Sequence, residues 1–233
     1  MSNNQSDFLI QARGLQKNYR RGKTLVEAVR GVDLDVPAGA FVVIIGPSGG
    51  GKTTLLHLLG GIDHPSAGKI SVNGQALEIA SESELTRFRR DHIGFVFQFY
   101  NLLPSLNALD NVILPLLARG WSWKKASQCG QAFLQRVGLQ ARWQHKPGEL
   151  SGGEQQRVAI ARALVGEPVV ILADEPTGDL DSVTSKEIIQ LMVDLNHQLG
   201  TTFIIATHNQ ATCQFATRTY EMRDGHLYPG MAA

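Results

Sequence analysis

The sequence contains no apolar stretch long enough to cross a lipid bilayer. A membrane-spanning helix needs roughly 18 or more consecutive apolar residues, and no run in the 233 residues approaches that length. The first seven residues are polar and contain no apolar signal segment. If the protein works at a membrane, we therefore expect a different chain to cross it.

Cysteine is scarce and the net charge is close to zero. The two cysteines, Cys129 and Cys213, lie far apart and outside any metal-ligand spacing, so we expect reduced thiols in a cytosolic protein. A formal net charge of +1 gives no electrostatic reason for a nucleic-acid partner, and we expect none. A hydrophobic content of 43% suits a well-buried α/β chain, with one large domain or a core that carries an inserted subdomain.

A glycine-rich loop is the most informative stretch. It lies between an apolar run at 41–45, which predicts a strand, and a helical pattern at 54–59. It fits the spacing G-x-x-x-x-G-K-[ST] of a phosphate-binding loop, and its residues are Gly46, Pro47, Ser48, Gly49, Gly50, Gly51, Lys52 and Thr53, followed by Thr54. The glycines let successive backbone N–H groups converge on phosphate oxygens, and the following helix adds its positive end. We therefore predict nucleoside triphosphate binding, with Lys52 on the β- and γ-phosphates and Thr53 on Mg²⁺.

Two adjacent acids follow a wholly apolar run. Residues 169–173 predict a central parallel strand buried on both faces, and Asp174 and Glu175 come next. Because side chains alternate along a strand, these two carboxylates should point in different directions. We expect Asp174 to hold Mg²⁺ in its second coordination shell and Glu175 to polarise the water that attacks the γ-phosphate. The preceding buried run makes a merely solvated acidic turn the weaker interpretation.

A second candidate anion site begins at Ser151. Ser151 and Glu154 form the S-x-x-E pattern of a capping box, and Gly152 and Gly153 leave the first helical amides bare. Alone, this pattern predicts only the start of a helix. One chain cannot readily wrap both anion sites around one nucleotide if the second lies on a separate helical subdomain. Two chains arranged head to tail can do so.

The periodicity places these motifs on an α/β chain with a helical interruption. Strands are predicted at 8–12, 25–29, 32–36, 41–45, 69–72, 93–97, 169–173, 202–206 and 219–223, and helices at 54–59, 84–90, 122–137 and 188–199. From 107 to about 164 the pattern is helical without a convincing strand. We expect Pro115 to bend or end the first helix there. We expect Trp121, Trp123 and Trp143 to be packing residues.

Six motifs in order resemble the ATP-binding cassette (ABC) ATPases over nearly the whole chain. They are Tyr19, 46–53, Gln98, 150–155, 171–175 with 179–181, and Thr207 with His208. The resemblance implies an α/β fold: a P-loop NTPase (RecA-like) core with an N-terminal antiparallel β subdomain and an inserted α-helical subdomain. The core and β subdomain would comprise 1–98 and 165–233, and the helical subdomain 99–164. It also implies ATP hydrolysis, with ATP and Mg²⁺ as ligands.

The resemblance assigns roles to residues that would otherwise be unremarkable. Tyr19, otherwise an ordinary strand-end tyrosine, would stack on adenine. Gln98 would lie near Mg²⁺ and the attacking water, and His208 would contact the γ-phosphate. Ser151, Gly152 and Gly153 would bind the nucleotide held by a second copy, across an interface crossed by the loop that contains Asp181. The expected catalytic residues are thus Lys52, Gln98, Glu175 and His208, and the expected metal-site residues are Thr53, Gln98 and Asp174.

Within that family the sequence most resembles the LolD/MacB branch, through 55–61, 97–104, 109–112 and 221–225. That branch powers lipoprotein release from the bacterial inner membrane or drives drug, peptide or haem efflux. The resemblance implies a peripheral protein on the cytoplasmic face of that membrane, with a second copy of itself and a separate integral membrane permease as partners. Apolar residues at 99–106 would line the groove for the permease.

Two other classes fit less well. A soluble, non-transport ABC protein typically carries two cassettes or a long coiled-coil insertion before the 151–153 motif, and this chain has neither. A phosphate-loop kinase or GTPase does not require the 151–153 motif. The sequence also lacks the Asn-Lys-x-Asp motif that recognises guanine. Two departures from the family pattern remain: Gly50 where serine is usual, and Asp179 where asparagine is usual. We expect the extra negative charge of Asp179 near the dimer seam to slow or loosen closure.

Overall fold

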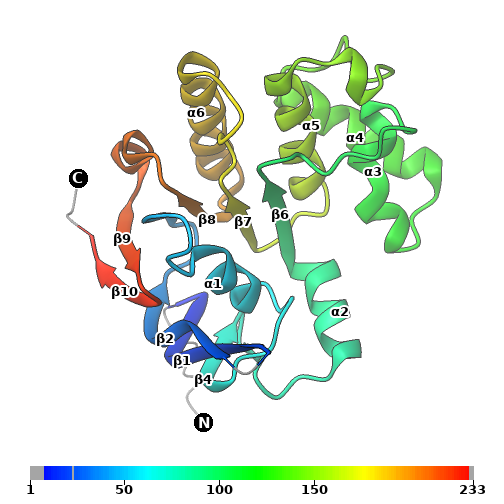
Figure 1. Ribbon diagram of the computed structural model, residues 1–233. Coiled ribbons are helices and arrows are strands. Elements are labelled where there is room, and N and C mark those ends of the chain that lie inside the picture. Colours follow the sequence, from blue (N-terminus) through cyan, green and yellow to red (C-terminus); the bar gives the residue numbers. More distant parts are fainter. Residues whose placement is uncertain (1–7, 23, 231–233) are drawn as a thin grey trace.

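A computed structural model describes residues 8–22 and 24–230 (Figure 1). Residues 1–7, on which the expected lack of a signal segment rests, lie outside the described residues. Within the described ranges, no helix has both the length and the apolarity that a bilayer crossing requires.

A six-stranded sheet forms the centre of the molecule, in the order β10-β9-β3-β8-β7-β6. The strands are β3 (Phe41–Ile45), β6 (Ile93–Phe97), β7 (Val170–Asp174), β8 (Thr202–Thr207), β9 (Arg218–Arg223) and β10 (His226–Pro229). All adjacent pairs are parallel except β9 with β10. Every residue of β8 is buried, as expected for a strand covered on both faces. The sequence did not reveal β10, which pairs with β9 across the Asp224-Gly225 turn.

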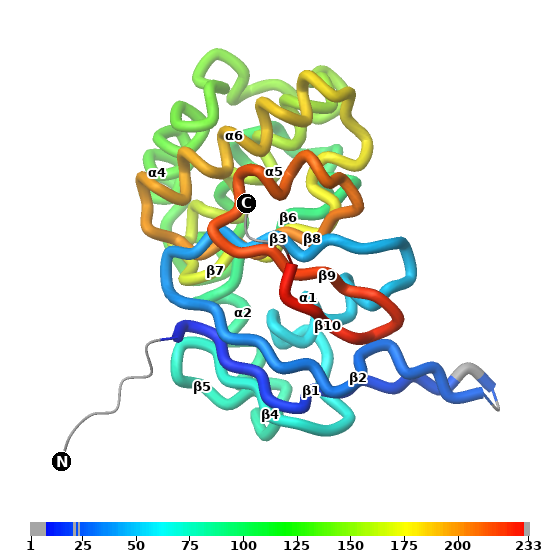
Figure 2. Tube along the Cα trace, turned by 90° about the vertical axis from the view of Figure 1, so that its left-hand side faces the viewer, coloured from blue at the N-terminus to red at the C-terminus, as the bar shows by residue number. Residues whose placement is uncertain are grey.

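A second, antiparallel sheet has the order β2-β1-β4-β5. Its strands are β1 (Ile10–Arg21), β2 (Thr24–Val36), β4 (Ala67–Val72) and β5 (Gln75–Ala76). The two short strands predicted at 25–29 and 32–36 are one strand, because Gly31 has a left-handed φ of 68° and forms a bulge where the pairing register shifts. The β1–β2 hairpin projects from the body of the molecule (Figure 2), and Tyr19 lies within it, paired with Val26.

Helix α1 (Lys52–Leu59) lies between the two sheets (Figure 1). Its four leucines are buried, and they belong to a core cluster that also includes β1, β2 and one face of the central sheet. Burying a leucine side chain contributes about 1.5–3 kcal/mol. This packing fixes the start of α1, and with it the glycine loop, against the central sheet.

The other face of the sheet belongs to a core cluster that it shares with α3 (Ala108–Ala118), α4 (Trp123–Arg136), α5 (Gly152–Leu164) and α6 (Ser182–Leu199). Helices α3 and α4 pack on α5, and the 3₁₀ turn η1 (Pro147–Glu149) precedes α5. Helix α2 (Glu82–His92) precedes β6, and the 3₁₀ segment η2 (Gln210–Phe215) precedes β9. The predicted helical interruption is confirmed for α3 to α5. The exact subdomain boundaries at 98/99 and 164/165 stay a prediction.

Two expectations about this helical part need correction. Of the two alternatives expected for Pro115, the end of the helix is wrong: α3 continues to Ala118, because buried neighbours such as Val112 and Leu116 hold the segment against the core. The bend at Pro115 stays a prediction. Trp121 and Trp143 pack against the core cluster, but Trp123 is 59% exposed. Trp123 is the first residue of α4, before the buried positions of that helix begin.

Candidate functional site

The glycine loop packs closely against the backbone of two other segments. A Cβ on Gly46 would lie 2.0 Å from the Met222 carbonyl oxygen, and one on Gly51, whose φ is 104°, would lie 2.3 Å from the Ala28 carbonyl oxygen. A Cβ on Gly50 would lie 2.9 Å from the same Met222 oxygen. Glycine at position 50, where the family usually has serine, therefore leaves the Met222 carbonyl undisturbed.

Lys52 is buried inside this loop, with 6% of its surface exposed. Its ammonium donates to the carbonyls of Gly46 at 2.9 Å and Pro47 at 3.1 Å. It also lies 3.6 Å from Glu175 Oε1. The loop lysine and the acid after β7 therefore share one site, although 123 positions separate them in the sequence (175 − 52).

Glu175 makes a second polar contact through its other carboxylate oxygen. His208 Nδ1 lies 3.0 Å from Glu175 Oε2, and the His208 backbone N–H donates to that oxygen at 3.3 Å. Glu175 has a φ of 46°, in the left-handed region that non-glycine residues rarely adopt. The carboxylate is therefore held at a strained turn between a lysine and a histidine.

Asp174, the last residue of β7, lies beside Thr53 at the start of α1. The Thr53 hydroxyl donates to its carboxylate, but burial dominates and raises the pKa of Asp174. Its Oδ1 is buried and has no hydrogen-bond partner among the described residues. A buried carboxylate oxygen without a partner, beside a threonine hydroxyl, is a donor set that fits Mg²⁺ and its bound water. The described residues contain no cluster of three or more His, Cys, Asp or Glu that could hold a metal.

Tyr19 lies beside the start of α1. Its hydroxyl donates to Asp63 Oδ2 at 2.8 Å, and the Lys17 ammonium lies 5.0 Å from its ring centroid. Burial and the bond to Asp63 raise the pKa of Tyr19, while a hydrogen bond with Thr54 opposes them. Asp63 thus ties the aromatic ring to the turn after α1, a partner that sequence reasoning missed because only the three-dimensional fold brings positions 19 and 63 together.

Gln98 follows β6 but is not bonded to Thr53 or Asp174. Its Nε2 donates to Asp179 Oδ1 at 3.0 Å. Asp179 belongs to the loop at 175–181, which connects Glu175 to the start of α6. The structure therefore joins two residues that the sequence singled out separately.

The 151–153 motif starts a helix, as predicted. Ser151 Oγ accepts from the Glu154 backbone N–H at 3.2 Å, and the Glu154 carboxylate accepts from the Ser151 N–H at 2.8 Å. Asp181 caps α6 by accepting hydrogen bonds from the backbone N–H groups of Val183 and Thr184.

The start of α5 lies beside the 175–181 loop. A Cβ on Gly152 would lie 3.0 Å from the Tyr100 hydroxyl and 3.2 Å from Leu180, and one on Gly153 would lie 2.7 Å from Thr184. Among the described residues, no hydrogen bond or ion pair joins 151–153 to the glycine loop of the same chain. The two candidate anion sites are therefore not in contact within one chain, and their role in binding anions stays a prediction.

Arg162 of α5 braces the backbone that follows Gln98. It donates to the carbonyls of Tyr100 at 2.7 Å and Asn101 at 2.5 Å, and both of these residues have left-handed φ angles, of 57° and 50°. Burial lowers the pKa of Arg162. No local sequence pattern predicts these contacts, because the acceptors are backbone carbonyls 61 and 62 positions away along the chain.

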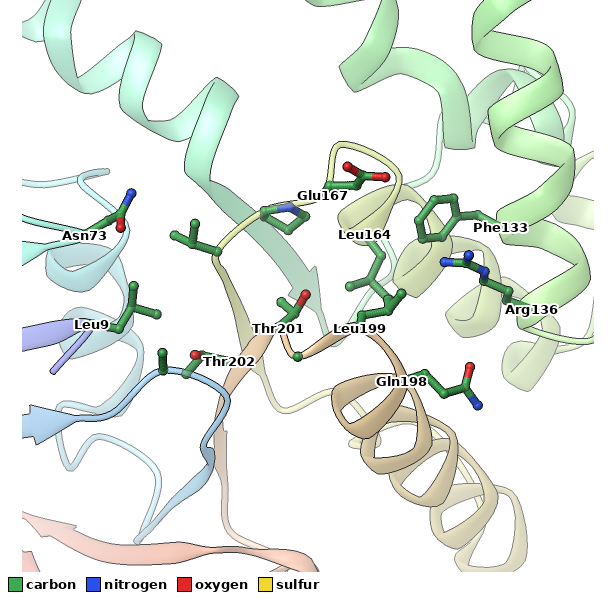
Figure 3. Close-up of a pocket in the computed structure, with 14 residues that line it drawn as sticks. Leu9, Asn73, Phe133, Arg136, Leu164, Glu167, Gln198, Leu199, Thr201 and Thr202 are labelled. Carbon is green, nitrogen blue, oxygen red and sulfur yellow. The ribbon is translucent and has the colours of Figure 1, made fainter. Parts of the chain in front are cut away.

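Two hollows differ in their relation to this site. One of about 560 Å³ adjoins it and is lined by Glu175, His208 and the 177–185 segment. Another, of about 590 Å³, lies where β7 and β8 begin and is lined by residues such as Glu167, Leu199 and Thr202 (Figure 3). The glycine loop follows the carboxyl end of β3, which is parallel to β8. The second hollow lies at the amino ends of the strands, and therefore on the opposite side of the sheet from the glycine loop.

Comparison with known proteins agrees with this geometry. Residues 29–178 match the family described as ABC transporter. The chain is 47% identical over 227 residues to the lipoprotein-releasing system ATP-binding protein LolD of Alcanivorax borkumensis, covering 96% of this chain and 98% of that protein. It is 46% identical to the LolD protein of Hydrogenovibrio crunogenus over 222 residues, 95% of this chain and 96% of the other.

A solved structure shares the fold. The dimeric ATP-binding cassette MJ0796, in a post-hydrolysis state bound to ADP and Pi, superposes with a TM-score of 0.88 at 39% identity, covering 96% of this chain and 98% of the other. This likeness confirms the predicted P-loop NTPase fold. The chain therefore belongs to the ABC transporter family, and it is an ABC transporter ATPase of the LolD branch.

Proposed function

We propose that this chain is the ATPase subunit of a lipoprotein-releasing system. Two copies would close over two ATP molecules, and hydrolysis would let them part and drive a separate membrane permease. The observation that supports this best is the identity of 46–47% to LolD proteins along nearly the full length of both chains. The protein would lie on the cytoplasmic face of the inner membrane, because ATP is available there and the permease would cross the bilayer.

The glycine loop and Lys52 would bind the triphosphate. The loop amides and the positive end of α1 favour anionic oxygens, and the Lys52 ammonium already lies within the loop. Tyr19 lies beside Thr54, at the start of α1, where a stacking platform for adenine could extend the same site. These contacts would account for nucleotide affinity.

Thr53 and Asp174 would hold Mg²⁺, with Gln98 nearby. The fit rests on the unpartnered, buried Asp174 Oδ1 and the adjacent Thr53 hydroxyl. When bound, the cation would neutralise charge on the phosphates. Thr53 would contact it directly, and Asp174 would act through a bound water.

Glu175 would act as general base, with His208 as its orienting partner. The bond from His208 fixes one carboxylate oxygen, and the other faces Lys52. A water that donates to Glu175 would gain nucleophilicity for attack on the γ-phosphate. His208 is exposed and could contact that phosphate once it is bound.

The helix start at 151–153 would complete the nucleotide site of the partner copy. In each chain these residues start α5, beside Leu180 and Thr184, away from that chain's own glycine loop. Head-to-tail pairing brings the start of α5 to the other copy's γ-phosphate, and Asp181 to the seam. Attraction between the phosphates and these helix ends would drive closure.

The permease would dock in a groove of about 290 Å³ between β6 and the helical part. The groove is lined by residues that include Phe95, Phe97 and Pro115. Phe99 and Leu103, on the adjoining segment, are 72% and 47% exposed. Such exposure of large apolar side chains is typical of an interaction surface.

Reconstitution tests this function. The chain would be co-purified with the permease encoded beside it, inserted into proteoliposomes that carry a fluorescently labelled lipoprotein, and supplied with Mg²⁺ and ATP. We expect ATP-dependent release of the lipoprotein, and no release with the variant Glu175→Gln. Intact ATP hydrolysis without release, together with stimulation by a drug or peptide, would instead favour an efflux system.

A further inference from the structure

Asp179 holds the side-chain amide of Gln98. Gln98 Nε2 donates to Asp179 Oδ1 at 3.0 Å. A Cβ on the intervening Gly178 would lie 2.9 Å from both Cδ and Nε2 of Gln98. The amide therefore packs against Gly178 of the 175–181 loop, with its nitrogen on the Asp179 carboxylate.

Asp179, the acceptor, belongs to the 175–181 loop, which several hydrogen bonds hold in place. The buried Gln156 side chain of α5 donates to the Pro176 carbonyl at 2.6 Å. Ser185 Oγ of α6 donates to the Leu180 carbonyl at 3.3 Å, and the Gly178 N–H donates to the Glu175 carbonyl at 3.0 Å. Because two helices and an internal turn fix this loop, Asp179 presents its carboxylate at a defined position.

A carboxylate at this position fixes which way the amide faces. An ionised carboxylate only accepts hydrogen bonds, so it must bind the –NH₂ group of Gln98 and leaves Oε1 free. An asparagine at position 179 carries both a donor and an acceptor, and it could pair with either end of the Gln98 amide. Cations and water protons are bound by the amide oxygen, never by its nitrogen.

We propose that Asp179 is a positioning residue: its carboxylate orients the Gln98 amide so that Oε1 always faces the metal and the attacking water. This inference rests on the proposed function, in which Gln98 serves the Mg²⁺–ATP site. It adds a role that the sequence did not suggest, because the sequence identified Asp179 only as extra charge near the seam. The two roles predict opposite effects of removing the charge.

Magnesium-dependent dimerisation distinguishes the two roles. In the Glu175→Gln background with fixed ATP, the fraction of dimer would be measured by analytical ultracentrifugation as Mg²⁺ is increased. Asp179→Asn should raise the Mg²⁺ concentration at half-maximal dimer about twofold, because two amide orientations become comparable in energy. Asp179→Ala should raise it about threefold to tenfold, because the orienting hydrogen bond is lost. If charge repulsion at the seam dominated, both substitutions would lower that concentration and the proposal would fail.

A double-mutant cycle supplies the control. In a Gln98→Ala background, Asp179→Asn should cause no further change in the Mg²⁺ requirement, since Asp179 acts through the Gln98 amide. An undiminished effect there would overturn the positioning role while leaving the proposed function intact. Complete absence of dimer at every Mg²⁺ concentration would instead overturn the proposed function, and this role with it. Both side chains lie near the surface, and melting curves of each variant without nucleotide would verify folding.

Discussion

Lys52 and Glu175 form an ion pair, with Nζ and Oε1 3.6 Å apart and the lysine almost fully buried. The pair joins the residue expected to bind phosphate with the residue expected to activate water. His208 contacts Oε2, the other oxygen of the Glu175 carboxylate. The Glu175 carboxylate therefore contacts both the lysine expected to bind phosphate and a histidine expected to contact the γ-phosphate.

Replacing Glu175 by glutamine separates these two functions. Glu175→Gln keeps the shape of the side chain and its contact with the His208 N–H, but it removes the base. We expect ATP binding to be retained, turnover to fall by about 10²- to 10⁴-fold, and an ATP-bound dimer to accumulate on gel filtration. A variant that stays monomeric with ATP and still hydrolyses it would contradict the role of Glu175.

A mixing experiment tests whether two chains share each nucleotide. Ser151→Arg would block the start of α5, and Lys52→Ala would disable the glycine loop, so each variant alone should be inactive. A mixed dimer contains one intact composite site, so an equimolar mixture should regain about a quarter of wild-type ATPase activity if pairing is random. If no mixing ratio restored activity, the sites would not be shared between chains.

Asp174→Asn should stabilise the protein while removing its activity. Burial raises the pKa of Asp174 in the folded chain, so this carboxyl favours folding below its unfolded pKa, and that contribution is lost as the pH rises through the folded value. At neutral pH the ionised, partly buried carboxylate therefore opposes folding.

Asparagine removes that charge, and we expect a higher melting temperature without nucleotide at pH 7. For a domain of this size, about 1 kcal/mol corresponds to a shift of about 2–4 °C. The difference between variant and wild type should shrink toward pH 4. A lower melting temperature at pH 7 would show that Asp174 is stabilised by contacts that asparagine cannot make.

The sequence was sufficient wherever a local pattern determines the structure. The glycine loop, the capping box of Ser151 and Glu154, and the buried strand before Asp174 each depend on neighbouring residues, and each is confirmed. The same logic would have found the capping box of Ser81 and Glu84, which starts α2 two residues before its predicted beginning.

Partners distant in sequence could not be predicted. The contacts of Tyr19 with Asp63 and of Gln98 with Asp179 depend on how two sheets and a helical part pack, and no local periodicity encodes them. The long β1–β2 hairpin was missed for a related reason, because cross-strand pairing stabilises a polar segment that has little strand pattern of its own. The resemblance supplied roles for these residues, and only the structure supplied their partners.

Gly46→Ala tests the packing behind the glycine loop. The added methyl would overlap the Met222 carbonyl oxygen, since the two atoms would be 2.0 Å apart. Either β9 or the loop must then move, and we expect a lower melting temperature together with loss of ATP binding. Gly148→Ala is the matched control, because a Cβ there meets nothing within 4 Å. Equal effects of the two substitutions would show that the close approach at Gly46 does not matter.

The exposed side chains of Phe99 and Leu103 test the permease groove. The double substitution Phe99→Glu and Leu103→Glu should leave basal ATPase activity in solution within about twofold, because both side chains already face solvent and surface changes rarely alter stability by much. It should abolish co-purification with the permease and binding to membranes that contain it, since two charges would be buried without partners. Leu102 is unsuitable for this test because it packs against the core.

Ile79→Glu provides the matched control for that experiment. Ile79 is 82% exposed and lies between β5 and α2, outside the residues that line the groove. Its substitution should leave membrane association unchanged, which separates a specific groove from a general need for surface apolarity. Continued co-purification of the Phe99 and Leu103 double variant with the permease would remove these two residues from the docking surface. Loss of binding by both variants would mean that apolar surface in general, rather than the segment after Gln98, carries the association.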